Sequence, residues 1–527
     1  MFYFVPSWYS EQRAFDNNTI VWFWHQPNML MDDITSLFKL FQRVDQPSTL
    51  LILGYMPHLR YYLHELDLLE QSYISIFDRL QDISEVTPKM VNFESLEWPK
   101  NTQFVYSPFL ILARQNGKKF AEINFGNDGQ LIWIDYFAKD VIERRFVIDD
   151  RGFLSSIIYF DHEGQELYQD YLNVEGIWQF RQYLQENHRI EVNPLVSSRF
   201  KKSSYDSLYQ LLEEFTISLF EEKVKPSDSF VLAYDETHND LILQHKGQRE
   251  LIVSFFQKRP TPSDDQLVVA LKEANLALTD TVSEYNRLSA YNQCPVANVS
   301  PYDARLSLGK SQRLKELIIY LLVDKLSFTD LDKIINETFD VMLTNENIQL
   351  LLVSYRTDYP FKSELEAFVE KKQEDWKRRQ GHVFLDDFEE EYEKEIQSAG
   401  QTVLQQSQEA SRLLLTFLTN ENELLNQLDK ARLIVDLSED PDLYTQIAGI
   451  SAGIPQINMV ATDYVESFKN GYIIHSLSEL KEAYDYYLLT LRNWNESLVY
   501  SVSKIGEYTS GSVVKKIMTL LRDNQNG

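Results

Sequence analysis

The sequence predicts an α/β protein made of two Rossmann-like domains, with an antiparallel β-sheet inserted into the first domain. Three observations support this fold class. Apolar runs typical of buried strands alternate with amphipathic helical stretches in both halves of the chain. Residues 104–171 instead show alternation of apolar and polar residues, interrupted by glycine turns. The chain also has 527 residues with 44% hydrophobic content, which is too long for one hydrophobic core.

The first 70 residues have the order strand, helix, strand, helix. Residues 1–5 and the TLLILG run at 49–54 predict strands, and residues 28–44 and 58–69 predict amphipathic helices. This order is typical of a parallel sheet covered by helices. No glycine-rich loop follows the first strand, where Ser10-Glu11-Gln12-Arg13 stands instead.

The stretch at 104–171 predicts an antiparallel meander. Its apolar and polar residues alternate, and its runs end at Asn116-Gly117, Asp128-Gly129, Arg151-Gly152 and Glu163-Gly164, pairs that suit tight hairpin turns. The meander is either purely structural or a surface for a partner or ligand.

Helix and strand patterns then return. Residues 204–222 and 266–274 and a segment from Ser283 predict helices, and residues 229–234, 241–245, 250–256 and 276–279 predict strands. The proline-containing segment 294–302 is the expected crossing to the second domain. There, strands are expected at 317–323, 348–355, 433–436 and 456–460, a solvated acidic helix and loop at 364–395, an amphipathic helix at 404–428 and closing helices at 477–521. We therefore expect an N-terminal Rossmann-like domain at 1–95 and 190–298, the inserted sheet at 96–189, a C-terminal Rossmann-like domain at 299–480, and helices at 481–527 that cross back to the first domain.

The charge balance restricts the partners. Seventy-nine acidic residues against 51 basic ones give a net charge of −28, which disfavours direct binding to nucleic acid or to an anionic membrane. The start of the chain does not have the pattern of a secretory signal, and no apolar run reaches the length of a membrane span. We therefore expect a cytoplasmic protein that reaches a membrane only through partners.

Common catalytic and metal-binding patterns are missing from the sequence. Its single cysteine, Cys294, excludes an intrachain disulfide and is a poor candidate nucleophile. The nine histidines are scattered, and no spacing matches a zinc or calcium site. No Walker, G-x-S-x-G or G-x-G-x-x-G sequence is present. The sequence therefore predicts no metal and no cofactor.

The most informative segment is 431–477, which combines a buried strand, a loop, a helix and a Gly-x-Pro turn at Gly453-Ile454-Pro455. It resembles the C-terminal half of retaining GT-B glycosyltransferases, in which two glutamates eight positions apart precede the Gly-x-Pro turn. Counting back from Pro455, the second glutamate position holds Ala448 and the first holds Asp440, with Glu439 beside it.

The alanine changes the chemistry that the resemblance implies. In the family, the second glutamate is implied to bind the ribose hydroxyls of the nucleotide, and the first lies against the donor sugar. Ala448 cannot accept a hydrogen bond from a hydroxyl, so the donor site is expected to be degenerate and the protein to have no catalytic residue.

Other positions are weaker candidates for ligand contacts. Arg305 and Lys310 repeat the spacing of the basic pair that holds the donor diphosphate in related transferases, but two basic residues five apart are common, and ordinary surface or linker contacts are the favoured explanation. Asp463-Tyr464 replaces the usual Gly-Gly turn and would crowd a diphosphate, which leaves Tyr464 as a candidate glycan contact. Trp8, Tyr9, Trp22, Trp24 and His25 are candidates for stacking on sugars, or else core residues.

Four segments carry a resemblance to one family over nearly the whole chain: MFYFVPSWY, YFDHEGQELYQDYL, SPYDARLSLGKSQR and DLYTQIAGISAGIPQIN. The chain is similar to the first accessory secretory proteins of the accessory Sec system of streptococci and staphylococci. The resemblance implies a cytoplasmic partner of the second and third accessory secretory proteins and of the accessory Sec motor ATPase. Such a protein takes part in the export of glycosylated serine-rich repeat adhesins.

Three functions follow from these observations. The first is a non-catalytic component that binds the partner proteins and the glycosylated adhesin. The second is an active glycosyltransferase that uses Asp440 or Glu439 as its acid, with Arg305 and Lys310 on the diphosphate. The third is a scaffold without a glycan ligand.

Overall fold

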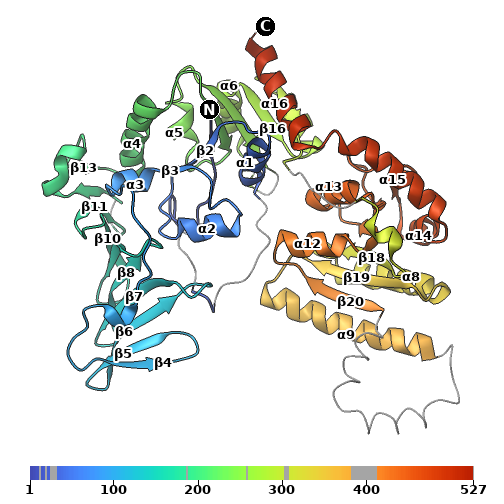
Figure 1. Ribbon diagram of the computed structural model, residues 1–527, viewed down its shortest axis with the longest axis horizontal. Helices are drawn as coiled ribbons and strands as arrows, with labels where there is room; N and C mark the ends of the chain where they lie inside the picture. Colours follow the sequence, from blue (N-terminus) through green and yellow to red (C-terminus); the bar gives the residue numbers. More distant parts are fainter. Residues whose placement is uncertain are drawn as a thin grey trace. The chain divides into compact units, whose positions relative to one another are not determined.

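The computed structural model describes residues 1–10, 13–17, 21–23, 32–185, 188–256, 259–260, 262–301, 308–381 and 412–525. The described residues up to Val299 form one compact unit, and those from Ser300 to Ile517 form a second. The chain from Met518 onward groups with the first unit. Each unit contains one parallel sheet, and the first also contains an antiparallel sheet (Figure 1).

The parallel sheet of the first unit has seven strands in the order β17-β16-β15-β14-β1-β2-β3. These strands are β1 (Phe2–Val5), β2 (Ser48–Ile52), β3 (Tyr73–Ser75), β14 (Ser229–Ala233), β15 (Glu250–Phe255), β16 (Leu276–Thr279) and β17 (Val296–Asn298). The segment 294–302, in which the crossing to the second domain was expected, contains the boundary between Val299 and Ser300. It also contains strand β17, because Val296 to Asn298 pair in parallel with β16 and extend the sheet by one strand.

Helices cover this sheet on both faces. Helix α1 (Asp33–Arg43) packs on one face through edge-to-face contacts of Phe38 and Phe41 with Phe4, whose ring centroids are 5.3 and 5.2 Å away. The other face shares a core with helices α3 (Ile76–Leu80), α4 (Leu208–Lys223), α5 (Asn239–Leu243), α6 (Asp264–Glu273) and α7 (Val282–Ser289). The strand predicted at 241–245 is wrong, because residues 241–243 belong to the short helix α5 and residues 244–245 form a turn.

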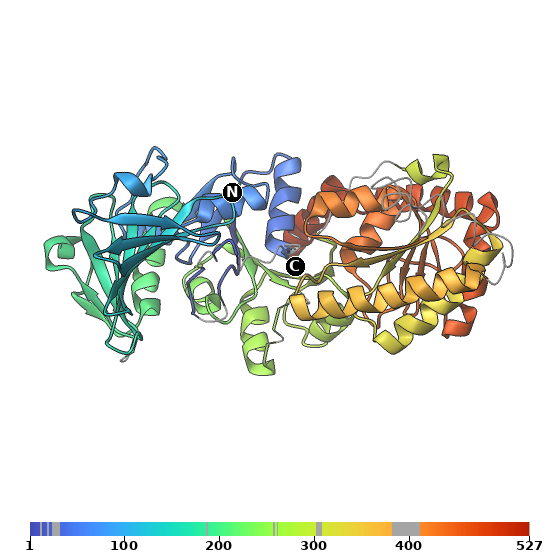
Figure 2. The same ribbon diagram turned by 90° about the horizontal axis from the view of Figure 1, so that it is seen from below.

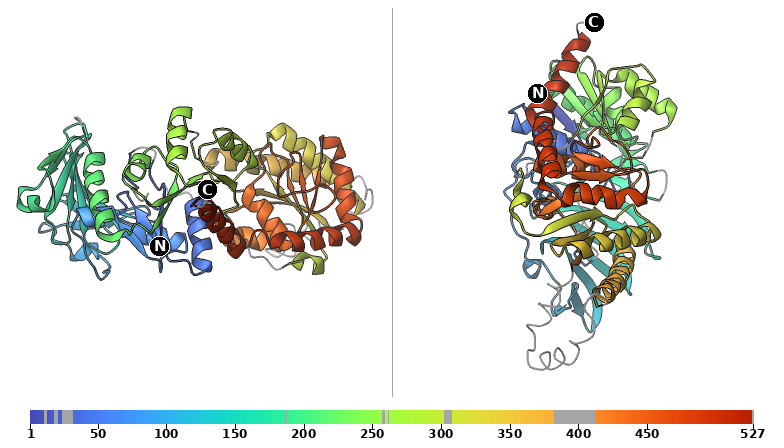
Figure 3. Two further views of the ribbon diagram at one scale, coloured as in Figure 1. Left: turned by 90° about the horizontal axis from the view of Figure 1, so that it is seen from above. Right: turned by 90° about the vertical axis from the view of Figure 1, so that its right-hand side faces the viewer.

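The antiparallel sheet is a ten-stranded meander in which β4 to β13 pair in sequence order. Its strands are β4 (Gln103–Tyr106), β5 (Ile111–Gln115), β6 (Lys118–Phe125), β7 (Leu131–Ala138), β8 (Val141–Ile148), β9 (Leu154–Phe160), β10 (Glu166–Leu172), β11 (Trp178–Tyr183), β12 (Ile190–Val192) and β13 (Ser204–Tyr205). The predicted turn at Asn116-Gly117 is confirmed, because both residues have positive φ angles, 53° and 78°, as a tight hairpin requires. Figure 3 shows α4 running alongside these strands.

Buried polar contacts join the antiparallel sheet to the Rossmann-like part of the first unit. The Tyr55 hydroxyl, at the end of β2, donates to Ser155 Oγ at 2.9 Å. The Gln81 amide donates to the Ser155 carbonyl oxygen, also at 2.9 Å. The Arg151 guanidinium, in the turn between β8 and β9, donates to both carboxylate oxygens of Asp78 at 3.0 and 2.8 Å. These contacts hold the two parts together as one folded unit.

The second unit has a six-stranded parallel sheet in the order β20-β19-β18-β21-β22-β23. Its strands are β18 (Leu317–Leu322), β19 (Ile348–Ser354), β20 (Leu413–Phe417), β21 (Ala431–Asp436), β22 (Gln456–Asn458) and β23 (Gly471–Ile473). Its helices are α8 (Phe328–Thr344), α9 (Tyr359–Gly381), α12 (Glu421–Leu428), α13 (Leu443–Ala452), α14 (Leu480–Leu488) and α15 (Leu491–Ile505). Helix α16 (Ser510–Gln525) begins in this unit, and its residues from Met518 onward group with the first unit. Figures 1 and 2 show helices on both faces, with α9 beside β20.

The helix predicted at 404–428 is wrong at 413–417 and confirmed at 421–428. Residues 413–417 form the edge strand β20, which pairs with β19, and only Glu421–Leu428 is helical. Residues 404–411 of that prediction lie outside the described part of the chain. Elsewhere the two parallel sheets with an antiparallel sheet in the first unit match the predicted α/β architecture.

Candidate functional site

Polar side chains gather where the strands of the second unit end. Asp324 follows β18, Tyr355 follows β19, and Asp436 is the last residue of β21. The carboxyl ends of parallel strands lie at one edge of the sheet, and ligands of α/β proteins bind at that edge. We therefore treat this edge as the candidate ligand site of the second unit.

Side chains around Asp324 are already bonded to one another. Ser354 Oγ donates to Asp324 Oδ1 at 2.5 Å, and the Tyr355 backbone N–H donates to Asp324 Oδ2 at 2.8 Å. The Tyr355 hydroxyl also lies 2.9 Å from the hydroxyl of Tyr320 and 2.6 Å from Thr445 Oγ1. Burial raises the pKa of both Asp324 and Tyr355. This cluster is therefore a closed network of satisfied groups.

Asp436 forms a second closed network. Its carboxylate accepts hydrogen bonds from Ser438 Oγ at 2.7 Å and from the Asp442 N–H at 2.7 Å. Its carbonyl oxygen accepts one from the Asn458 amide at 3.0 Å. Burial raises the pKa of Asp436, even though the hydrogen bonds from Ser438 and Asp442 oppose the shift. Asp442 in turn caps α13 by accepting from the Thr445 N–H at 2.9 Å. The carboxylates at this edge therefore hold the loop after β21 in place.

The positions that were predicted to form a degenerate donor motif do not form one site. Asp440 lies in the loop after β21, where its carboxylate pairs with Lys325 Nζ at 2.5 Å, and Glu439 beside it is exposed. Ala448 is fully buried in α13, in an apolar cluster with Tyr444 and other core residues. Its methyl group therefore faces a packed core instead of a ligand space.

Gly453, Pro455 and Lys310 belong to the opposite edge of the same sheet, where the strands begin. Gly453 ends α13 with φ at 71°, and Pro455 directly precedes β22. Lys310 is brought near this turn, since the Gly309 N–H donates to the Ala452 carbonyl oxygen at 2.9 Å. The Lys310 ammonium group pairs with Asp429, so it is engaged away from Asp440.

Tyr464 and Arg305 are the remaining two candidates. Tyr464 is only 6% exposed and packs against Tyr508, with ring centroids 5.5 Å apart, so it is a core residue. Arg305 lies outside the described residues.

The first unit has a comparable polar edge where β1 and β14 end. The Tyr9 hydroxyl lies 2.8 Å from His238 Nδ1, and His238 Nε2 lies 2.8 Å from the Ala233 carbonyl oxygen. A carbonyl oxygen only accepts, so Nε2 carries the proton and Nδ1 accepts from Tyr9. Burial lowers the pKa of His238 and raises that of Tyr9. Ser7 donates to Asp235 beside them. These groups, too, are satisfied internally.

Farther along this edge, at the start of α1, Asp33 is almost fully buried and is engaged twice. It accepts hydrogen bonds from Ser254 Oγ and from the Arg259 guanidinium. Trp8, one of the aromatic candidates, is 6% exposed, contacts Tyr62 edge to face and donates through Nε1 to Asp32 at 3.3 Å. Trp8 and Tyr9 therefore belong to the interior. Trp24 and His25 lie outside the described residues.

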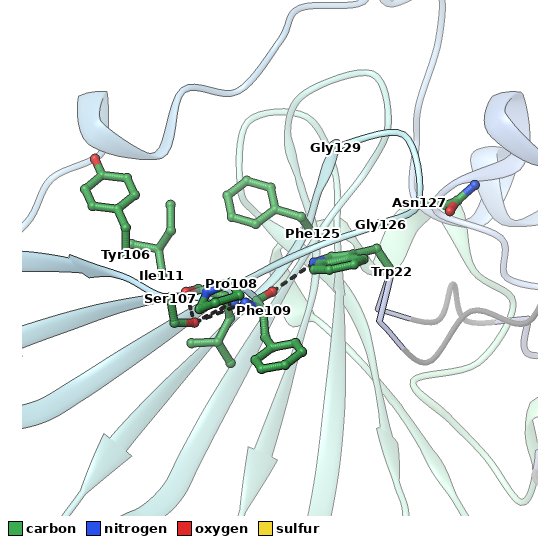
Figure 4. A pocket seen from close by; sticks show the side chains of 11 residues that line it. Trp22, Tyr106, Ser107, Pro108, Phe109, Ile111, Phe125, Gly126, Asn127 and Gly129 are labelled. Atoms are coloured by element: carbon green, nitrogen blue, oxygen red, sulfur yellow. Dashed lines mark hydrogen bonds between the residues drawn. The ribbon is translucent and has the colours of Figure 1, made fainter. Parts of the chain in front are cut away.

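Trp22, in contrast, lines an open pocket of about 400 Å³ at the edge of the antiparallel sheet (Figure 4). Its ring is 40% exposed and stacks with Phe109, at 6.3 Å between centroids and 18° between planes. Trp22 Nε1 donates to the Phe109 carbonyl oxygen at 2.9 Å. Phe125, Tyr106 and the turn that contains Asn127 complete the wall. The pocket thus offers flat aromatic faces beside an exposed amide.

Sequence reasoning missed both polar edges. Asp324 and Asp436 come directly after apolar runs, and Tyr355 follows the run at 350–353 after one serine; these positions at strand ends could have identified the three as neighbours. Within the described chain, no group of three or more histidine, cysteine, aspartate or glutamate side chains is placed to hold a metal ion. None of the helices among these residues has the length and hydropathy that a membrane span requires.

The model of the family of accessory secretory protein 1 of the accessory Sec system matches residues 1–524. A member of that family from Streptococcus gordonii is 37% identical over 527 residues, which cover 98% of each chain. The structure is similar to a chain of the "Glycosylation Associate Protein (Gap123) complex from Streptococcus agalactiae", with a TM-score of 0.81, 38% identity and coverage of 99% and 100%. It is also similar to a chain of the complex of accessory secretory proteins 1, 2 and 3 from Streptococcus pneumoniae, with a TM-score of 0.80, 34% identity and full coverage of both chains.

A more distant likeness concerns the fold alone. The pneumococcal O-GlcNAc transferase GtfA, solved with UDP and GlcNAc, aligns with a TM-score of 0.68 at 12% identity, over 100% of this chain and 99% of that one. This likeness confirms the predicted GT-B-like fold class. The full-length family match and the relative at 37% identity go further than the fold. The chain belongs to the family of accessory secretory protein 1 of the accessory Sec system.

Proposed function

We propose that this chain is a non-catalytic, cytoplasmic component of the accessory Sec export machinery. It forms a complex with the second and third accessory secretory proteins and binds the glycosylated serine-rich repeat adhesin. The solved complex of accessory secretory proteins 1, 2 and 3, which contains a chain 34% identical to this one, supports the complex. The accessory Sec motor ATPase is the further partner, and the membrane is reached only through such partners.

The observation that carries the non-catalytic role is the burial of Ala448. A nucleotide-sugar donor needs a hydrogen-bond acceptor for its ribose hydroxyls, and a methyl group in an apolar core is not one. Asp440, at the other glutamate position, is paired with Lys325. The carboxylates of Asp324 and Asp436 are committed to neighbouring donors. Additional negative charge at this edge also disfavours a diphosphate.

The pocket around Trp22 is our candidate contact for the adhesin glycan. Aromatic faces stack on the C–H surfaces of sugars, and the exposed rings of Trp22 and Phe109 provide such faces. Asn127, exposed at the rim, can both donate to and accept from a sugar hydroxyl. The pocket therefore suits a short glycan on an extended polypeptide.

Two titrations test this proposal. Calorimetry with UDP-GlcNAc and UDP-glucose should show no binding at millimolar concentration. A fluorescent Ser/Thr-rich peptide carrying GlcNAc should bind, and its unglycosylated form should bind much more weakly. Micromolar affinity for a nucleotide sugar, or turnover of one, would support the glycosyltransferase alternative. If the complex forms and the glycopeptide does not bind, the protein is a scaffold.

The pocket is tested separately with Trp22→Ala. Loss of one aromatic stacking face should weaken glycopeptide binding by about tenfold, on the order of 1.4 kcal/mol. Trp22→Phe keeps a ring and should retain most of the affinity. Tyr359→Ala, at a tyrosine that is 75% exposed on α9, is the control. Equal affinities for all three variants would remove the pocket from the proposal.

A further inference from the structure

One row of aromatic and basic side chains crosses five strands of the antiparallel sheet. Tyr136 on β7 is opposite Arg144 on β8, and Arg144 is opposite Tyr159 on β9. Tyr159 is opposite Tyr168 on β10, which is opposite Tyr183 on β11. Directly opposed residues of an antiparallel sheet point to the same face. At about 4.8 Å per strand, the row is about 19 Å long.

The members of this row contact one another. The rings of Tyr159 and Tyr168 stack, with centroids 4.6 Å apart and planes at 27°, and the Tyr183 ring lies 6.1 Å from Tyr168. The Arg144 guanidinium lies 5.1 Å from the centre of the Tyr136 ring. All five side chains are half-buried. Burial also raises the pKa of Tyr159 and Tyr168, so their phenols stay neutral. The row is thus a preordered aromatic surface.

The two faces of the sheet have different neighbours. Tyr171 and Phe180, on the opposite face, are buried in the core that the antiparallel sheet shares with the Rossmann-like part. On the face of the row, the segment with Phe93 and Trp98 packs over β5 to β8. Among described residues, the ring contacts of Tyr159, Tyr168 and Tyr183 all come from this sheet or from Arg189 in the adjoining loop. As far as the described residues go, this part of the face is therefore left uncovered by the first unit.

The charges on this face differ in sign from the whole chain. Arg181 lies over Tyr168 and binds Asp170 through two hydrogen bonds, at 2.6 and 2.9 Å. Arg189 lies over Tyr183, whose hydroxyl donates to Glu191 at 2.8 Å.

Arg144 and Arg189 form no ion pair with any described carboxylate, and Arg144 Nε is buried without a hydrogen-bond partner. Among the described residues, the contacts of the row thus involve three arginines, Arg144, Arg181 and Arg189, and two carboxylates, Asp170 and Glu191. These contacts contain more basic than acidic groups, on a chain whose net charge is −28.

We propose that this tyrosine–arginine face, comprising Arg144, Tyr159, Tyr168, Arg181, Tyr183 and Arg189, binds an acidic protein surface on the second or third accessory secretory protein. The inference rests on the complex proposed above. Tyrosine and arginine are the residues that most often dominate binding energy at protein interfaces. Stacked tyrosines have little conformational freedom left to lose. Arg144 and Arg189 can each donate charge-assisted hydrogen bonds to a carboxylate of the partner.

The test uses the full-length chain and the purified second and third accessory secretory proteins, with Kd measured by biolayer interferometry. The double substitution Arg144→Glu with Arg189→Glu should raise Kd by about 30-fold, the loss typical of a hot spot. Arg144→Met with Arg189→Met keeps the side-chain stems and should cause a smaller loss. Tyr168→Ala should weaken binding, and Tyr168→Phe should not. The controls are Arg378→Glu, at an arginine whose side chain is 72% exposed on α9, and Tyr359→Ala.

The outcomes distinguish a failure of the proposed complex from a failure of the proposed tyrosine–arginine face. If the wild type does not bind the other two proteins, the proposed complex fails, and this inference fails with it. If the wild type binds and the reversed variant binds within threefold of it, only the present inference fails. It also fails if the variants lose glycopeptide binding alone, because the face would then belong to the adhesin. Unchanged melting temperatures of the variants would show that they remain folded.

Discussion

Replacing Ala448 by glutamate tests the proposed donor-site degeneration directly, because it introduces the residue that the sequence motif predicts for a glycosyltransferase at this position. Ala448 is fully buried in α13, so the larger side chain must displace its apolar neighbours. Overpacking of this kind costs about 1–3 kcal/mol. A carboxyl in such a core shifts its pKa upward by roughly 3 units, at about 1.4 kcal/mol per unit. The sum, about 5–7 kcal/mol, approaches the whole stability of a typical domain.

The electrostatic part of this cost depends on pH. The introduced carboxyl has its ordinary pKa, about 4.3, in the unfolded chain and a raised pKa in the folded chain. Above about pH 4.3 the folded state retains a proton that the unfolded state releases, so stability falls as pH rises until the folded-state pKa is reached. Ala448→Gln has nearly the same size without the charge, so its cost should not change over this range.

Urea unfolding followed by circular dichroism at pH 5 and pH 7.5 measures both effects. Val269→Glu, at a position that is 53% exposed on α6, is the control and should change stability by less than about 0.5 kcal/mol. If Ala448→Glu were as stable as the wild type and bound UDP-GlcNAc with micromolar affinity, Ala448 would face a functional donor site. The proposed loss of catalysis would then be refuted.

Three further substitutions test individual environments. Burial lowers the pKa of His58 to about 4, so below about pH 6.5 the unfolded chain takes up a proton before the folded chain does. His58→Leu should therefore remove up to about 3 kcal/mol of the destabilisation that the wild-type fold suffers between pH 6.5 and pH 4, and equal acid sensitivity of the two proteins would contradict this. Arg432 is buried, two of its guanidinium nitrogens have no hydrogen-bond partner among the described residues, and its guanidinium lies 4.9 Å from the centre of the Trp494 ring. Arg432→Met should therefore unfold no earlier in urea than the wild type, and a loss of more than about 2 kcal/mol would show that the guanidinium is satisfied. At Gly453, where φ is 71°, an added Cβ would lie 2.2 Å from Leu498 Cδ1, so Gly453→Ala should lower the melting temperature. In a double-mutant cycle, Leu498→Ala should restore part of that loss, unless the strain is in the backbone alone.

The alternation of strands and helices could be predicted because long apolar runs in an α/β protein are buried on both faces. The runs at 317–323 and 348–355, for example, correspond to β18 and β19 at the centre of the second sheet. The hairpin glycines were equally informative, since Gly117, Gly129, Gly152 and Gly164 all have positive φ angles. In both cases a local pattern coincides with a strong local constraint.

Short apolar runs were misread where the neighbouring residues decide the outcome. Before α5, the Asp235 carboxylate accepts from the Thr237 N–H at 2.8 Å, and the Asn239 side chain accepts from the Asp235 N–H at 3.0 Å. These bonds start a helical turn that periodicity alone does not reveal. Before α12, Asn420 accepts from the Glu423 N–H at 3.0 Å, a capping signal that separates the helix from strand β20.

The candidate site could be located only in part. The motif count led to Ala448 and Asp440, which are residues of α13 and of the loop before it. It could not show that Ala448 faces the core. Nor could it show that Lys310 is at the opposite edge of the sheet and pairs with Asp429. Both facts depend on side-chain packing between distant segments of the chain. The tyrosine row was missed for the same reason, since strand register brings its members together.

The buried contacts between the antiparallel sheet and the Rossmann-like part decide how the sheet can be studied. Excising it would strip Tyr55, Gln81 and Asp78 of their partners and leave a donor, an amide and a carboxylate facing an empty interior. A truncated protein would lose binding because it misfolds, whichever surface the partner uses. Single substitutions on the outer face leave those anchors in place, and only they can assign a partner to this sheet.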